Sequence, residues 1–110
     1  MIALRDMLRK FVAERDWDKF HSPKNLAMAL SVEASELLEH FQWLTEEQSR
    51  RLAPEKLAQV RDEMADVLVY LVRLADKLDV DLLDAAAKKI EKNALKYPAD
   101  KVRGKYRMDE

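Results

Sequence analysis

Cysteine is absent from this sequence of 110 residues, glycine occurs once and proline three times. Without cysteine, neither a disulfide framework nor a thiolate metal site can form. Long hydrophobic runs are also absent, and none approaches the ~20 residues that a helix needs to cross a membrane. The first residues lack the basic start and apolar stretch of a signal peptide. We therefore expect a cytoplasmic protein that has no membrane partner.

Neither sign of charge predominates, because 20 basic and 21 acidic side chains nearly cancel and leave a formal net charge of -1. Proteins that grip a nucleic-acid backbone usually need a clearly basic face, so we expect no nucleic-acid partner. Charged residues make up 37% of the chain. Together with so few glycines and prolines, this composition favours helices over strands and predicts an all-α fold. One domain of this length buries a modest core, which oligomerisation would enlarge.

The spacing of apolar residues predicts four helices, at roughly 2–15, 23–41, 54–78 and 82–96. Ser22 is a suitable N-cap for the second helix, and Pro23 suits its first position because the missing N–H costs nothing there. Thr45 and Gln48 predict a capping box for one short helical turn between the second and third helices. Pro98 ends the fourth helix, because the residue before a proline disfavours the helical conformation.

Four acidic residues lie where the predicted helices should present apolar side chains. At ~100° per residue, Glu33 and Glu36 lie on the apolar face of the second helix, and each pair of acids is spaced i, i+3. Glu63 and Asp66 lie likewise on the third helix. An inward carboxylate without compensation is very costly, so the pattern predicts bound cations, and carboxylate oxygens suit Mg²⁺ or Mn²⁺. The alternative is that the acids are solvated or paired with Lys and Arg.

Aromatic residues bracket these acids along the chain. Trp17 and His21 precede the second helix, Trp43 follows it, and Tyr70 lies one turn after Asp66. Flat side chains near a polyphosphate site could sandwich a base, since stacking contributes ~1–3 kcal/mol per base. The alternative is that the tryptophans plug the ends of a small bundle.

Basic residues gather near the other end of the chain. Lys89 and Asn93 share one face of the fourth predicted helix and could contact phosphate or sugar oxygens, although most such lysines only solubilise a surface. The tail 99–110 is basic, and we expect it to be a solvated and poorly ordered surface segment rather than a triphosphate ligand.

Further short motifs accompany the acidic pairs, in a fixed order. They are Arg15-Asp16-Trp17, Phe20-His21, Pro23, Asn25-Leu26, Phe41-Gln42-Trp43, Val67-Leu68-Val69-Tyr70-Leu71 and Lys96-Tyr97-Pro98. Together with E-x-x-E at Glu33 and Glu36 and E-x-x-D at Glu63 and Asp66, this series resembles the all-α nucleotide pyrophosphohydrolases of the MazG-like superfamily. It is most similar to the dCTP pyrophosphatase branch, over about residues 14–98.

The resemblance implies a fold and a set of roles. The fold is a four-helix bundle, here residues 1–98, completed by oligomerisation into a dimer or tetramer. Mg²⁺ would be bound by all four acids, with Glu33 or Glu36 also orienting or deprotonating the attacking water. The base, sugar and phosphates would be contacted by Trp17, His21, Asn25, Trp43, Tyr70, Lys89 and Asn93. His40 departs from the pattern, since many relatives carry an apolar residue there.

The implied activity is hydrolysis of a nucleoside triphosphate, dCTP or a modified pyrimidine deoxynucleotide, to the monophosphate and pyrophosphate. One alternative is a broader house-cleaning hydrolase that acts on several non-standard triphosphates. Another is a helical oligomerisation module without catalysis, whose acids form salt bridges between chains. A carboxylate-bridged di-iron bundle is disfavoured, because it normally needs Glu-x-x-His and Glu36 and His40 are spaced i, i+4.

Overall fold

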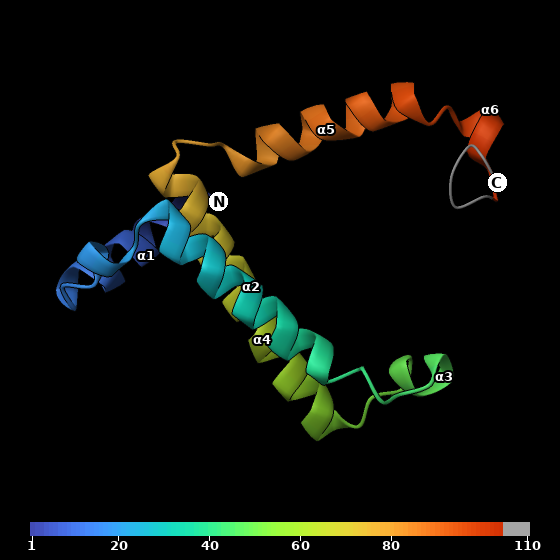
Figure 1. The fold of residues 1–110 in the computed structure, drawn as a ribbon, viewed down its shortest axis with the longest axis horizontal. Coiled ribbons are helices and arrows are strands. Elements are labelled where there is room, and N and C mark those ends of the chain that lie inside the picture. Colours follow the sequence, from blue (N-terminus) through green and yellow to red (C-terminus); the bar gives the residue numbers. More distant parts are fainter. Residues whose placement is uncertain (105–110) are drawn as a thin grey trace. The chain divides into compact units, whose positions relative to one another are not determined.

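The computed structural model describes residues 1–104, which contain helices and turns and no strand. The predicted all-α class is therefore confirmed. The chain divides into two compact units, one ending at Asp79 and the other beginning at Val80. Their elements, drawn in Figure 1, are α1 (Ile2–Glu14), η1 (Asp18–Phe20), α2 (Pro23–Glu39), α3 (Glu46–Ser49), α4 (Pro54–Lys77), α5 (Leu82–Lys96) and α6 (Ala99–Val102).

The predicted helix starts are confirmed by their capping bonds. At α2, the hydroxyl of Ser22 accepts the backbone N–H of Asn25 at 3.1 Å, and Pro23 occupies the first turn. At α3, the side chains and backbones of Thr45 and Gln48 form a reciprocal capping box. Both caps satisfy N–H groups that the helix itself leaves unpaired.

Two predictions about helix ends were wrong. The second helix ends at Glu39 rather than near residue 41, because the N–H groups of His40 and Phe41 bond three residues back, to Leu37 and Leu38. Such bonds tighten the last turn and stop the α-helix. The stretch after Pro98 was predicted to be a poorly ordered surface tail, but it begins with the short helix α6, whose N-cap is Pro98. Predictions that concern residues 105–110 lie outside the described part of the chain.

The chain leaves α1 through a Schellman turn. The N–H of Trp17 bonds to the carbonyl of Val12 at 3.1 Å, and the N–H of Asp16 bonds to that of Ala13 at 3.2 Å. This pairing satisfies two carbonyls at the end of the helix and requires a left-handed residue between them. Asp16 takes that conformation, with φ of 54°. The turn connects α1 to η1.

The first unit is built around α2 and α4, which run side by side in opposite directions (Figure 1). Leu26 of α2 is only 1% exposed, and Val60 and Val72 of α4 are also buried. Val12 of α1 is buried as well, and α1 contacts α4. Burying one such side chain contributes ~1.5–3 kcal/mol, so this small set of residues fixes the register of the three helices.

The second unit contains α5 and α6. Asp81 caps α5, because its side chain accepts the N–H of Asp84 at 3.1 Å. Apolar side chains of α5 such as Ile90 and Leu95 are exposed. In residues 1–104, no helix is both long and apolar enough to cross a bilayer. The division of the chain into a domain 1–98 and a tail remains a prediction.

Candidate metal site

Three of the four predicted acids converge on one point between α2 and α4. A carboxylate oxygen from each of Glu33, Glu36 and Glu63 lies within 4.8 Å of the others. Glu33 and Glu36 are neighbours because they are spaced i, i+3 on α2. Glu63 joins them because α4 packs against α2 along its length. All three side chains are half-buried, so the cluster lies at the edge of the helix interface.

Two oxygens of this cluster are buried without a hydrogen-bond partner. They are Oε2 of Glu33 and Oε2 of Glu63. Of the ion pairs formed within residues 1–104, none involves Glu33, Glu36 or Glu63. Leaving a buried acceptor unsatisfied costs free energy, and the cost is larger for a charged group. Among residues 1–104, neither lysine nor arginine pairs with these acids, as the alternative of salt-bridged acids requires.

The pKa of Glu33 also reflects the burial of this carboxylate. The pKa of Glu33 is raised from 4.5 to about 7, mainly by burial and then by hydrogen bonding with the carboxylates of Glu63 and Glu36, which favours the protonated form. The negative charge of Asp66 contributes in the same direction. At neutral pH the chain therefore holds a carboxylate that needs either a proton or a cation.

These residues fit a divalent cation. Carboxylate oxygens are the hard ligands that Mg²⁺ and Mn²⁺ prefer, and the unpartnered oxygens of Glu33 and Glu63 are the atoms a cation would satisfy. Asp66, the fourth predicted ligand, is exposed and lies outside the group of three converging carboxylates. Its effect on Glu33 indicates that it is near the cluster, and its role as a ligand remains a prediction.

The predicted base-binding residues lie in several different environments. Trp43 follows α2 and is 86% exposed, whereas Tyr70 on α4 is half-buried. Trp17 makes an edge-to-face contact with Phe11, with ring centroids 5.7 Å apart. Trp17 is nevertheless 44% exposed, so this contact does not decide between a base-binding role and a packing role. Asn25 donates its side-chain N–H to the carbonyl of Phe20 at 3.1 Å, which ties η1 to the first turn of α2.

Lys89 and Asn93 are exposed on α5, in the second unit. The helix places them on one face, as their spacing predicts. His40 is half-buried just beyond α2. The roles of Lys89 and Asn93 toward phosphate or sugar remain predictions.

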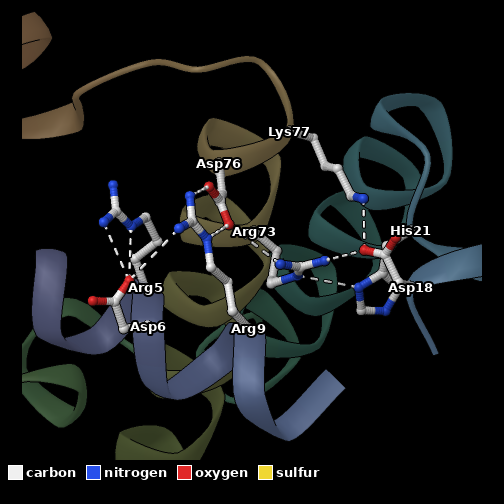
Figure 2. Close-up of polar contacts among 8 residues, drawn as sticks. All are labelled: Arg5, Asp6, Arg9, Asp18, His21, Arg73, Asp76 and Lys77. Carbon is white, nitrogen blue, oxygen red and sulfur yellow. Dashed lines mark hydrogen bonds and ion pairs between the residues drawn. The ribbon is translucent and has the colours of Figure 1, made fainter. Parts of the chain in front are cut away.

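A buried arginine was missed by the reasoning from sequence. Arg73 of α4 is 3% exposed and contacts Asp18, His21 and Asp76 (Figure 2). The signal was present in the sequence, because Arg73 interrupts the run of apolar residues between Val72 and Leu74. A charge at such a position is seldom buried unless it is paired. Two of its partners, Asp18 and His21, lie more than 50 residues away, and no local pattern points to them.

The all-α fold and the E-x-x-E and E-x-x-D motifs on two antiparallel helices, with three of their acids brought together, agree with the resemblance to the MazG-like superfamily. The chain belongs to the MazG-like family, which matches residues 28–107. That match includes all four acids.

Individual relatives are also similar. dCTP pyrophosphatase 1 of Mus musculus is 43% identical over 103 residues, which cover 92% of this chain and 61% of the relative. dCTP pyrophosphatase 1 of Homo sapiens is 42% identical over 106 residues, covering 94% and 62%. The chain thus spans about three fifths of the length of these curated relatives. A crystal structure of a pyrophosphatase from Archaeoglobus fulgidus matches with a TM-score of 0.84 and 42% identity, covering 89% of this chain and 92% of that one.

Proposed function

We propose that this protein hydrolyses a deoxynucleoside triphosphate between its α and β phosphates, releasing the monophosphate and pyrophosphate. The observation that carries the proposal is the convergence of Glu33, Glu36 and Glu63 with two buried, unpartnered oxygens. Membership in the MazG-like family and the names of the similar proteins, dCTP pyrophosphatase and pyrophosphatase, support it.

Mg²⁺, or Mn²⁺ in its place, would be held by Glu33, Glu36 and Glu63, with Asp66 as the fourth ligand. When bound, the cation neutralises charge that develops on the phosphates and lowers the pKa of a water molecule. The chain itself supplies the orientation, because the ligands come from two helices whose register is fixed by packing.

Of the two candidates for the residue that takes the proton from water, Glu36 is the better placed. Glu33 has a buried oxygen that no protein group satisfies, so we assign that residue to the cation. Neither oxygen of Glu36 is buried and unpartnered in this way. We therefore propose Glu36 as the general base, which must lie within hydrogen-bond reach of the attacking water.

The substrate we propose is dCTP or a modified pyrimidine deoxynucleotide, after the printed names of the mouse and human relatives. Base contacts are proposed for Trp17, His21, Asn25, Trp43 and Tyr70. Phosphate or sugar contacts are proposed for Lys89 and Asn93.

We also propose that the protein works as a homo-oligomer, a dimer or a tetramer. Few side chains are buried in the single chain, and large apolar residues remain exposed on both central helices. On α2 they include Val32 and Leu38, and on α4 they include Met64 and Leu68. An extended apolar surface of this kind is typical of a subunit interface. Light scattering on the purified protein measures the state directly.

The test of the proposed function is release of pyrophosphate from a panel of natural and modified deoxynucleotides in the presence of Mg²⁺. We expect Glu63→Gln to lower kcat by at least ~100-fold, because loss of even an outer-shell group around a metal costs 10–100-fold. The matched control is Glu55→Gln, which removes one charge from the exposed start of the same helix. An active Glu63→Gln variant would contradict the assignment. Equal rates on many nucleotides would indicate a house-cleaning enzyme, and no release from any would favour a non-catalytic module.

A further inference from the structure

Arg73 is enclosed by hydrogen-bond partners from three parts of the first unit (Figure 2). Its Nε–H donates to Nδ1 of His21 at 3.3 Å. One terminal nitrogen, Nη2, donates to Oδ1 of Asp18 at 3.1 Å, and the other, Nη1, donates to Oδ2 of Asp76 at 3.4 Å. All of the guanidinium nitrogens are thus used, and the side chain is held in one orientation.

This arrangement determines where the proton of the imidazole lies. An arginine side chain carries five N–H donors and no acceptor. Nδ1 of His21 must therefore offer a lone pair to Arg73, and a neutral ring then carries its hydrogen on Nε2. Among residues 1–104, Nε2 makes no hydrogen bond to the protein, so that hydrogen is free to bond to a ligand.

The charges around His21 keep the ring neutral. Burial lowers the pKa of His21, and the positive charges of Arg73 and Lys77 lower it further, against the opposing effect of Asp18. Lys77 donates to Oδ1 of Asp18 at 2.6 Å, so this carboxylate is shared between two cations. A third cation, that of Arg9, bonds to Asp76 at 2.8 Å. Three cations thus share two carboxylates, and an imidazolium would add a further positive charge.

We propose that Arg73 is a positioning residue of the nucleotide site, which holds His21 in the tautomer that presents an Nε2–H donor. This rests on the proposed function, in which His21 contacts the base. The group that such a donor selects is a hydrogen-bond acceptor, a ring nitrogen or a carbonyl oxygen, and a cytosine ring offers both on one edge. A protonated amine or an N–H on the base is disfavoured at the same position, because two donors cannot pair.

Imidazole ¹⁵N NMR tests the proposal without nucleotide or activity. The chain has two histidines, so His40→Gln leaves His21 as the only signal. We expect a single tautomer protonated on Nε2 at neutral pH. In Arg73→Lys, which keeps the charge but removes the Nε donor, we expect shifts averaged between tautomers. A ring protonated on Nδ1, or identical spectra of the two proteins, would overturn the proposal even if the enzyme is active.

Kinetics on the full chain then separates positioning from simple support of the fold. We expect Arg73→Lys to raise KM roughly 3- to 10-fold with little change in kcat, the loss expected for one neutral hydrogen bond. In a His21→Phe background the same substitution should leave KM unchanged, because both variants remove the same interaction. Equal increases in KM in both backgrounds would show that Arg73 does not act through His21. Absence of pyrophosphate release from wild-type protein would count against the proposed function but would leave the NMR result standing.

Discussion

Oε2 of Glu33 on α2 and Oε2 of Glu63 on α4 are both buried, and neither accepts a hydrogen bond from the protein. Each helix therefore brings a carboxylate oxygen to the interface without a protein partner for it. Such an arrangement lowers the stability of the single chain. It is useful only if something positively charged binds there, which is why a cost to the fold counts as evidence for a site.

Thermal melts with and without metal test this reading. Mg²⁺ that binds the folded chain and not the unfolded one stabilises it by about 2.7 kcal/mol at a concentration 100 times its Kd. We expect the Tm of the wild-type protein to rise with Mg²⁺ and to rise further with a non-hydrolysable nucleotide. Glu33→Gln should melt higher than the wild type in EDTA, since it removes repulsion, and should respond little to Mg²⁺.

The matched control for the melts is Glu55→Gln, which should follow the wild-type curve under both conditions. A Glu33→Gln protein that gained as much from Mg²⁺ as the wild type would exclude Glu33 as a ligand.

Stability without metal should also depend on pH through Glu33, whose pKa is raised from 4.5 to about 7. The folded chain binds this proton more tightly than the unfolded chain does. The stability that the group contributes is therefore present below pH 4.5 and is lost as the pH rises through 7. In EDTA, urea titrations should show the wild type losing free energy of unfolding relative to Glu33→Gln across this window. Parallel curves for the two proteins would contradict the raised pKa.

The helices could be predicted from the sequence because the residues that start them act within one turn of the chain. Ser22 and Pro23 start α2 with groups that act within one turn, and Thr45 with Gln48 does the same for α3. The inward position of Glu33 could be predicted for a related reason, because the helical period alone places it on the face that packs against another helix. Glu63 was named as its partner through the resemblance to the MazG-like superfamily, and the packing of α4 on α2 brings the two carboxylates together.

The features that were missed depend on distant contacts or on unusual backbone. The Schellman turn after α1 carries no glycine to mark it, because Asp16 takes the left-handed conformation instead. Arg73 meets Asp18 and His21 across more than 50 residues of chain. Contacts of this kind form only when the tertiary structure does, so periodicity and capping rules contain no information about them.

Replacing Arg73 by methionine should destabilise the first unit more than an exposed substitution of the same kind. The change removes the hydrogen bonds that buried Arg73 donates to Asp18, His21 and Asp76, while Lys77 and Arg9 still pair with the two carboxylates. We therefore expect a loss of about 1.5–3 kcal/mol, the range for hydrogen bonds to charged groups. Arg61→Met is the matched control, because Arg61 is exposed on the same helix. Its effect should stay within about 0.5 kcal/mol. Equal losses for both variants in chemical denaturation would show that the buried contacts contribute nothing.

His21 predicts a pH dependence of the opposite sign to that of Glu33. The pKa of His21 is lowered below its ordinary value of 6.5, so the unfolded chain binds the proton more tightly. The stability contributed by the neutral ring is present above pH 6.5 and is lost as the pH falls through the folded-state value. Because the Glu33 effect overlaps, the comparison is best made in a Glu33→Gln background. There, His21→Gln should flatten the acid side of the stability curve, and an unchanged slope would contradict the assignment.

Substituting each of the two tryptophans by alanine should distinguish effects on substrate binding from effects on stability. Trp43 is 86% exposed, so Trp43→Ala should change the free energy of unfolding by no more than about 0.5 kcal/mol. If Trp43 stacks on the base, the same variant should raise KM by about 5- to 150-fold, which corresponds to the ~1–3 kcal/mol of a stacked base. Trp17, for which a base contact is also proposed, contacts Phe11 edge to face, so Trp17→Ala should in addition lower the Tm through loss of about 0.5–1.5 kcal/mol. Denaturation and steady-state kinetics on both variants measure these effects side by side. A Trp43→Ala protein with unaltered KM would leave that residue without a role in the site, however freely its ring is exposed.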